Sequence, residues 1–250
     1  MDFSLSSEKT EKRGSVIGET ISVILQALLL AVVLRTFLYQ PFSIPSGSMK
    51  PSLLIGDYLF VSKFSYGYSK YSIPFAPDLF NGRIWSSEPK RGDIAVFKYP
   101  PNPEIDYIKR VIGLPGDKLQ MVGGILYLNG QPVKRERAKE NYLDDEGGLG
   151  PVPIFIETLP NGVSYQTLDL NPQSLGDDTQ VFEVPEGEYF MMGDNRDNSA
   201  DSRFEVGTVP FDHFVGRASV IFFSMKDGTH PLAIWKWPSD LRFSRVFDGL

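Results

Sequence analysis

Residues 45–53 read PSGSMKPSL and follow closely on the only membrane-length apolar run in the chain. Pro45 and Pro51 each fix the backbone angle φ, and Gly47 allows backbone geometry that other residues avoid. A loop of this kind can hold a serine hydroxyl rigidly. A cluster of serine, glycine and proline is, however, more often a solvated turn. A functional interpretation of this loop therefore needs support from the rest of the chain.

The apolar run before this loop spans residues 16–38 and reads VIGETISVILQALLLAVVLRTFL. Its uncharged part, residues 20–34, is shorter than the about 20 residues that cross a bilayer, but Arg35 can extend toward the headgroups. A cleaved signal peptide and a buried soluble helix are the alternatives, and no small-x-small cleavage site follows the run. We therefore expect residues 16–38 to be a retained transmembrane anchor that follows a cytoplasmic tail, residues 1–15.

The basic residues before the run predict its orientation. Lys9, Lys12 and Arg13 precede the apolar residues, and positive charges favour the cytoplasmic side of a membrane. We therefore expect a single-pass protein whose residues after about 38 lie on the outer face.

The composition of the 250 residues favours a β-rich fold and excludes several kinds of chemistry. Glycine (23), proline (19) and aromatic residues (13%) are plentiful, as in proteins with many strands and turns. The chain has no cysteine, which excludes disulfides, thiolate nucleophiles and cysteine-ligated metals. Its net charge of −6 and the lack of a basic block argue against nucleic acid as a partner.

Several segments have the β-branched and aromatic composition of strands. These segments are residues 57–65, 94–99, 105–112, 181–184, 188–192 and 214–225. Gly123-Gly124 and Asn129-Gly130 predict hairpin turns.

Other segments lack this strand pattern. Residues 66–90 predict a long loop, and residues 134–180 predict an inserted lobe because they are charged and only intermittently apolar. The polar residues 193–203 are either a solvated loop or a network around a site. The tail after residue 226 ends in a short helix or lies near the membrane.

A nucleophilic serine needs a base. His213 and His230 are the only histidines; spacing does not exclude a triad, but no G-x-S-x-G motif is present. We interpret both as surface residues rather than bases or metal ligands. Lys109 lies inside the apolar run 105–112 and is either an edge-strand lysine or a desolvated base. A serine paired with a buried lysine is a known form of serine hydrolase.

Three stretches of this chain resemble the sequence boxes of the bacterial type I signal peptidases, or leader peptidases. They are IPSGSMKPSL (44–53), RGDIAVFKYP (91–100) followed by DYIKRVIGLPGD (106–117), and GDNRDNSADSR (193–203). Members of that family are membrane-bound Ser-Lys endopeptidases that remove signal peptides from exported preproteins. The resemblance implies a bacterial cytoplasmic-membrane enzyme whose catalytic domain lies on the outer, periplasmic face.

The resemblance also implies a mainly β fold, in which an N-terminal transmembrane helix precedes antiparallel sheets with a smaller inserted β lobe. The expected organisation is a catalytic core formed by residues 39–133 and 181–250, with the lobe at 134–180 between them. The expected partners are preproteins and the lipid bilayer, and we expect no cofactor and no metal.

Residue by residue, the resemblance implies that Ser48 is the nucleophile and Lys109 the general base. The N–H of Ser48 and the hydroxyl of Ser46 resemble the oxyanion hole, and Ser199 resembles the serine that orients the lysine. The expected supporting network is Asp194, Arg196, Asp201 and Arg203.

The resemblance implies two shallow substrate pockets that accept small residues at the first and third positions before the cut. In the family, the isoleucines equivalent to Ile44 and Ile108 lie between the two pockets. The candidate walls are Phe42, Ile44, Pro45, Met49, Leu53, Leu59, Val96, Tyr107 and Ile108, and each of these could instead be a core residue.

Two features depart from the family pattern. Many members have a second transmembrane segment before the serine box, whereas one is found here. Glu205 follows Phe204 where the family commonly has glycine directly after an aromatic residue. Two other classes remain open: a self-cleaving Ser-Lys protease of the same fold, and a non-enzymatic envelope binding protein.

Overall fold

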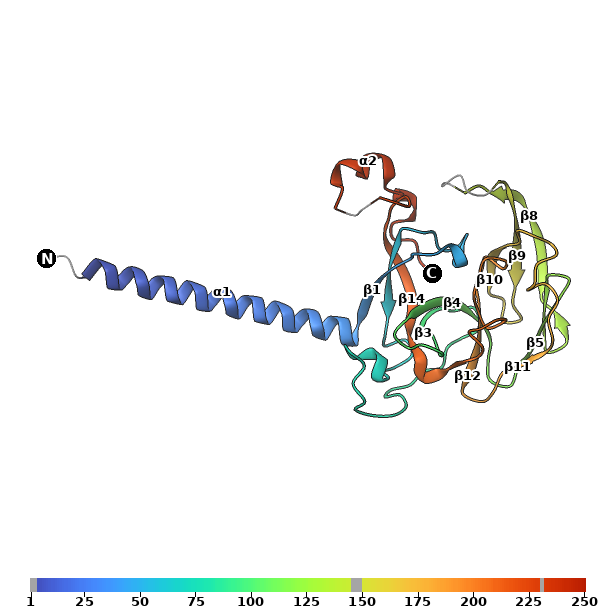
Figure 1. Ribbon diagram of the computed structural model, residues 1–250, viewed down its shortest axis with the longest axis horizontal. Coiled ribbons are helices and arrows are strands. Elements are labelled where there is room, and N and C mark those ends of the chain that lie inside the picture. The colour runs from blue at the N-terminus through green and yellow to red at the C-terminus, as the bar shows by residue number, and fades with distance from the viewer. Residues whose placement is uncertain (1–3, 145–149, 230–231) are drawn as a thin grey trace.

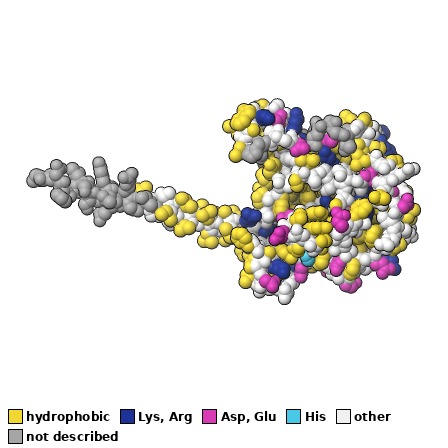
Figure 2. Space-filling model, viewed as in Figure 1, with side chains coloured by type: hydrophobic (Ala, Val, Ile, Leu, Met, Phe, Trp, Pro, Cys, Tyr) yellow, Lys and Arg dark blue, Asp and Glu magenta, His cyan; other side chains and the backbone are white. Residues whose placement is uncertain are grey.

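The computed structural model describes residues 4–144, 150–229 and 232–250. One long helix, α1 (Ser4–Phe37), projects away from a body of β-strands (Figure 1). Within these residues it is the one helix long and apolar enough to cross a membrane, over Gly18–Phe37 with a mean hydropathy of 2.0. Hydrophobic side chains cover its described surface and pack against almost nothing in the chain (Figure 2). The helix also includes most of the segment expected as a cytoplasmic tail.

The main sheet of the described chain is antiparallel and has seven strands in the order β1-β2-β14-β3-β4-β12-β13. The bounds of its strands are β1 (Tyr39–Ser43), β2 (Asp57–Ser62), β3 (Ile94–Lys98), β4 (Asp106–Gly113), β12 (Glu188–Met192), β13 (Val209–Pro210) and β14 (Phe214–Ser224). Five of these strands, β2, β3, β4, β12 and β14, agree with the β-branched and aromatic segments of the sequence, whereas β1 and β13 lie outside those segments. The mainly β fold predicted from the sequence is confirmed.

Two smaller antiparallel sheets complete the described body. One has the order β11-β5-β6-β7 and contains β5 (Lys118–Val122), β6 (Ile125–Leu128), β7 (Gln131–Pro132) and β11 (Phe182–Glu183). The predicted hairpin turns join its strands, and Asn129 and Gly130 both have positive φ. The other has the order β10-β9-β8, with β8 (Lys134–Tyr142), β9 (Val152–Thr158) and β10 (Ser164–Leu168). These last three strands lie within the segment expected as an insert, whose status as a separate lobe stays a prediction.

The remaining elements are short. The long segment after β2 contains only a 3-10 helix, η2 (Lys70–Ser72), in agreement with the predicted loop. The others are η1 (Gly47–Met49), η3 (Phe211–His213), η4 (Ile234–Lys236), α2 (Trp237–Asp240) and η5 (Phe243–Arg245). The tail therefore does contain a short helix.

The sheet brings three distant segments together. The loop that carries Ser48 leaves the edge strand β1, and η1 contacts β4, which carries Lys109. Strand β12 pairs with β4, with Met192 opposite Arg110, so that the polar segment 193–203 begins beside β4. The three sequence boxes that carry the family resemblance thus meet at one place in the fold.

Candidate active site

Ser48 lies in the 3-10 turn η1, and two hydrogen bonds from Asn195 hold this turn. Asn195 donates its backbone N–H to the carbonyl of Ser48 at 3.1 Å and its side-chain amide to the carbonyl of Gly47 at 3.0 Å. The neighbouring Met49 is fully buried in the core cluster below the turn. The hydroxyl of Ser48 is therefore held on a rigid support.

Lys109 on β4 points its amine at this hydroxyl. Its Nζ lies 2.7 Å from Oγ of Ser48 and also donates to the carbonyl of Ile108 at 3.0 Å. Lys109 and Ser48 are both buried, with 4% and 7% of their surfaces exposed. The Lys109 amine also lies 5.3 Å from the centre of the Tyr107 ring, as two side chains on the same face of a strand can.

Burial changes the acid–base behaviour of this lysine. Loss of solvent disfavours the ammonium form and lowers the pKa of Lys109 from 10.5 to about 8, although the negative charges of Asp201 and Asp194 oppose this effect. A substantial fraction of the amine is therefore neutral at mildly alkaline pH. A neutral amine at hydrogen-bond distance from a serine hydroxyl can accept its proton.

Ser46 lies on the exposed side of Ser48. The two hydroxyl oxygens are 3.4 Å apart. The hydroxyl of Ser46 is free to turn, so it can donate to an oxygen bound near Ser48. This position fits the donor role expected for Ser46 in an oxyanion hole.

Ser199 lies close to the pair but does not make the expected bond. It is 7% exposed, and its Oγ has no hydrogen-bond partner among the described residues. The predicted hydrogen bond to the Lys109 amine is thus not formed in this structure. The amine instead donates to the hydroxyl of Ser48 and the carbonyl of Ile108.

Gly193 allows Ser199 and the Ser48 backbone to approach each other. A Cβ at position 193 would clash with both Oγ of Ser199 and the carbonyl oxygen of Ser48. Only glycine, which has no Cβ, fits at position 193 when the serine loop and Ser199 lie this close to it.

Asp194 connects the serine loop to the lysine strand. It accepts two bonds from the guanidinium of Arg110, at 2.8 and 2.6 Å, and one from the hydroxyl of Ser52 at 2.5 Å. Burial opposes the charge of Arg110, but the Asp194 carboxylate outweighs this effect and raises the pKa of Arg110. Sequence reasoning missed Arg110 and Ser52, although each lies within four residues of a catalytic candidate.

Arg196 extends the network into the sheet β8–β10. Its guanidinium makes two bonds to Glu157 of β9, at 2.8 and 2.7 Å, and one to the hydroxyl of Tyr165 of β10 at 3.2 Å. Glu157 and Tyr165 are buried, and the Tyr165 ring lies 4.2 Å from the guanidinium of Arg110. The segment expected as an insert therefore contributes buried polar residues beside the site.

Asp201 and Arg203 complete the network. Arg203 makes a buried ion pair with Asp201 at 2.9 Å and donates to the carbonyl of Arg196 at 2.6 Å. Asp201 also accepts the N–H of Gly193 at 3.0 Å. Of the two possibilities for residues 193–203, the structure therefore has the buried polar network.

The expected pocket residues differ in their burial and in the cluster they pack against. Five of them are core residues of one cluster below the serine loop: Ile44, Met49, Leu53, Leu59 and Val96. Phe42 and Ile108 are partly buried at the edge of that cluster, and Pro45 is exposed. Tyr107 belongs to a different cluster and stacks on Tyr99. A bound chain would thus meet Phe42 and Ile108 first.

The histidines do not take part in this arrangement. His213 lies in η3 with its ring 5.4 Å from that of Tyr71, and burial lowers its pKa. The hydrogen-bond partners of the Ser48 hydroxyl are instead Lys109 and Ser46. His230 lies outside the described residues. Within the described part of the chain, no group of three or more histidine and acidic residues could hold a metal ion.

Comparisons with known proteins identify the family. Residues 17–223 match the family described as signal peptidase, peptidase S26. Proteins named signal peptidase I from Rickettsia typhi and Rickettsia prowazekii are each 42% identical, over 88% of this chain and 89% of each relative. A crystal structure of a signal peptidase I from Enterococcus faecalis is 26% identical and covers 52% of this chain and 97% of its own, with a TM-score of 0.32. On its family match and on its curated relatives, the chain belongs to the signal peptidases of the peptidase S26 family, which are hydrolases.

Proposed function

We propose that this chain is a membrane-bound endopeptidase that cleaves N-terminal signal peptides from exported preproteins with a Ser48–Lys109 dyad. The observation that carries the proposal is the 2.7 Å separation between Nζ of Lys109 and Oγ of Ser48, in a site where the pKa of the lysine is lowered to about 8. The membership of this chain in the signal peptidase family favours this function over that of a self-cleaving protease or a binding protein.

The first half of the reaction uses the neutral amine of Lys109 as a base. The amine takes the proton of the Ser48 hydroxyl while Oγ attacks the carbonyl carbon of the scissile peptide. The tetrahedral intermediate carries negative charge on its oxygen, which the N–H of Ser48 and the hydroxyl of Ser46 stabilise. The Lys109 ammonium then gives its proton to the departing amine, which leaves as the new N-terminus of the mature protein.

The second half hydrolyses the acyl-enzyme. The amine of Lys109 is neutral again and takes a proton from a water molecule, whose oxygen attacks the ester carbonyl. The second tetrahedral intermediate collapses, Ser48 recovers its proton from the ammonium, and the signal peptide leaves with a free carboxylate. One lysine thus serves as base and acid in both halves.

The remaining site residues hold this pair in place. Asn195 fixes the turn that carries Ser48, and Asp194 ties this turn to Arg110, the neighbour of Lys109. We assign Arg196, Asp201 and Arg203 to the support of the segment 193–203. Ser199 adjoins Ser48 with a free hydroxyl, so it can bond the amine once a substrate displaces Lys109 from its present partners.

The membrane anchor in this proposal is α1. Its apolar part ends at Phe37, and β1 begins at Tyr39, which places the catalytic body close to the bilayer surface. The basic residues Lys9, Lys12 and Arg13 put the N-terminus in the cytoplasm. The catalytic body then lies on the outer face of the bacterial cytoplasmic membrane, where exported chains emerge.

A direct experiment tests this function. The full chain is purified in detergent and given a preprotein that carries a signal peptide, and the products are followed by mass spectrometry. The wild type should release the mature protein, and Ser48→Ala should leave the preprotein uncut. Equal cleavage by both proteins would contradict the proposal.

A further inference from the structure

Two pockets adjoin where α1 meets the β-body, away from the Ser48–Lys109 pair. One is polar, with a volume of about 380 Å³, and the other is almost entirely apolar, with a volume of about 440 Å³. Ile73 and Pro74 line both, so the two hollows share part of their walls. Figure 2 shows basic side chains at this junction beside the hydrophobic surface of the helix.

The polar pocket holds two basic groups that form no ion pair among the described residues, and the carboxylates of Glu104 and Asp106 line the same pocket. Arg35 is exposed in the last turn of α1, and Lys63 is 2% exposed directly after β2. Within the described residues neither forms an ion pair, and Lys63 donates only to the carbonyl of Ser72, at 2.7 Å. Lys98, by contrast, pairs with Asp106 at 2.9 Å.

The two cations repel each other. Burial lowers the pKa of Lys63 to about 8, and the positive charge of Arg35 is the next largest cause. At neutral pH Lys63 still carries most of its charge. An anion between Arg35 and Lys63 would relieve this repulsion, and a phosphodiester has the charge and the acceptor oxygens to do so.

The apolar pocket runs along the last turns of α1. Val32, Val33 and Phe37 form its helix side, and Phe80 and Trp85 from the loop after β2 form the other side. This loop is fastened to the helix, because the Tyr68 hydroxyl donates to the carbonyl of Phe37 at 2.8 Å and the two rings make an edge contact.

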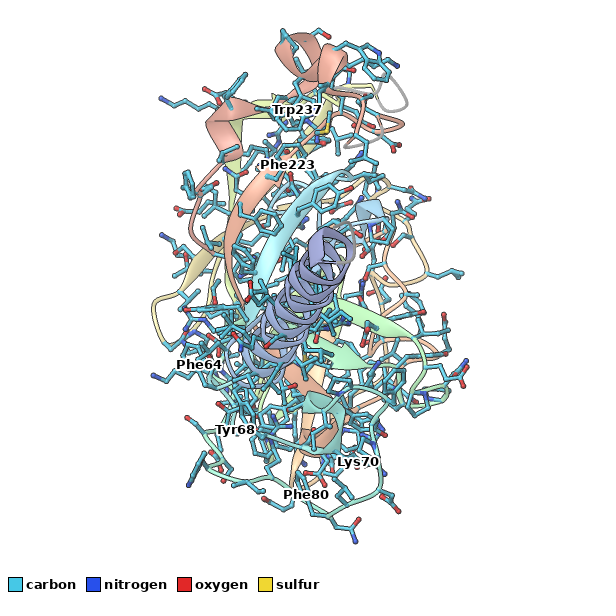
Figure 3. The ribbon with its side chains drawn as sticks, turned by 90° about the vertical axis from the view of Figure 1, so that its left-hand side faces the viewer. Phe64, Tyr68, Lys70, Phe80, Phe223 and Trp237 are labelled. Carbon is cyan, nitrogen blue, oxygen red and sulfur yellow. The ribbon has the colours of Figure 1, made fainter. Side chains whose placement is uncertain are left out.

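Figure 3 places Tyr68 and Phe80 on the same side of the helix end. Thr36 also lines the groove; it is 7% exposed, and its hydroxyl has no hydrogen-bond partner among the described residues. The groove is therefore a built hollow between two fastened walls, and it contains one unpaired polar group.

We propose that the two pockets form a binding site for one anionic phospholipid, with its phosphodiester between Arg35 and Lys63 and one acyl chain in the groove beside α1. The two pockets match the parts of a lipid, since Arg35 lies in the same last turns of α1 as Val32, Val33 and Phe37, so a headgroup at the cations can have its acyl chain in the adjoining groove. A basic pocket next to a membrane helix is a recognised way to bind a headgroup. The proposal rests on the membrane span proposed above.

A bound lipid would act as a wedge between the anchor and the catalytic body. Its headgroup would contact β2 through Lys63, and β2 pairs with β1, the strand that leads to Ser48. The lipid would thus fix the tilt of the body on the bilayer surface.

The test uses the full chain in detergent with phosphatidylglycerol as the probe, and native mass spectrometry to count retained lipids. Arg35→Gln/Lys63→Met should need about thirtyfold more lipid for the same retention, since each of the two basic residues contributes to lipid affinity at the level expected for a cation near a membrane surface. Lys70→Gln is the matched control, because Lys70 lies in the same loop but outside both pockets. Val33→Trp, which fills the groove from an exposed helix position, should also weaken retention.

The outcomes separate the possible occupants. Equal retention by the wild type and the double variant overturns the proposal. Displacement of the lipid by inorganic phosphate alone overturns the role of the groove, and displacement by a synthetic signal peptide identifies the substrate as the occupant. Extraction of the wild type from membranes by alkaline carbonate would instead contradict the membrane span, and so is distinguishable from failure of the lipid site.

Discussion

Nζ of Lys109 and Oγ of Ser48 lie 2.7 Å apart although 61 residues separate them in the chain. Strand β4 brings the lysine to this point, and the turn after β1 brings the serine. Because the amine is buried, its pKa lies near 8 instead of 10.5. Lys109 is therefore both within hydrogen-bond distance of the Ser48 hydroxyl and partly neutral near pH 8, as a general base must be.

The pH dependence of cleavage follows from this pKa. The neutral amine is the active form, so kcat/KM should rise about tenfold per pH unit in acid and level off above about pH 8. The measurement is a pH–rate profile with a peptide substrate whose own groups do not titrate in this range. A midpoint near 6.5, the ordinary pKa of histidine, would contradict a lysine base.

A chelator separates this chemistry from metal catalysis. Incubation with EDTA followed by gel filtration should leave the cleavage rate unchanged, because the proposed steps use only Ser48, Ser46 and Lys109. Loss of activity that returns on addition of zinc would contradict the mechanism.

The buried ion pair between Asp194 and Arg110 should be important for stability. Asp194→Ala removes the carboxylate and leaves Arg110 buried and unpaired, which costs about 3–5 kcal/mol. The melting temperature of the detergent-solubilised protein should fall by roughly 10 °C. Glu183→Ala is the control, because its pair with Lys118 is largely exposed and should change the melting temperature little. An equal melting temperature for Asp194→Ala and the wild type would contradict the structural role.

The topology proposal predicts which parts of the chain a protease can reach. Protease added to spheroplasts should digest the body after about residue 38 and leave a short N-terminal fragment that includes Lys9, Lys12 and Arg13. An epitope tag at the N-terminus identifies the fragment by immunoblot. Full protection of the body, with loss of the tag, would reverse the orientation.

Ile108 and Ile44 should limit the size of the residue before the cut. Both side chains are stiff because they branch at Cβ, and one extra methylene against such a wall costs about 1–3 kcal/mol, or roughly 10–200-fold in rate. The double change to Ala should therefore admit larger residues and cut additional bonds, which mass spectrometry of one preprotein would show.

The two single variants separate specificity from folding. Ile108→Ala should keep the melting temperature, because Ile108 is only partly buried, whereas Ile44→Ala removes a core residue. A double variant that cuts only the original bond, with the original preference, would rule out these two residues as pocket walls.

Much of the fold could be predicted because local chemistry determines it. The strands near 57, 94, 106, 188 and 214 have β-branched and aromatic residues, and the Asn129-Gly130 turn has the residues that positive φ requires. The anchor is recognisable from its apolar length. The curl of the sheet, which brings β1 and β4 together, has no such local signal, and only the family resemblance pointed to the meeting of Ser48 and Lys109.

The parts of the site that sequence reasoning missed depend on long-range contacts. Buried and more exposed residues alternate along the first part of β9, and this alternation breaks at Ile156, which is exposed, and Glu157, which is buried. A regular alternation would place Glu157 on the exposed face of the strand. Arg110 follows Lys109 and points to the other face of β4, toward Asp194. The sequence around Asn195 indicates only a polar segment, whereas in the structure the backbone N–H and the side-chain amide of Asn195 both hold the serine turn.

Lys109→Met is the decisive test of Lys109 as the base of Ser48, because methionine keeps the apolar stem of the side chain and lacks the amine. Preprotein cleavage in detergent at pH 8.5 is measured for the wild type, Lys109→Met, Ser48→Ala and the double variant. Both single variants should lose more than about 10³-fold in kcat/KM, and the double variant should lose no more, since residues that act as a unit are not additive. Cleavage by Lys109→Met within tenfold of the wild-type rate would show that Lys109 is not the base.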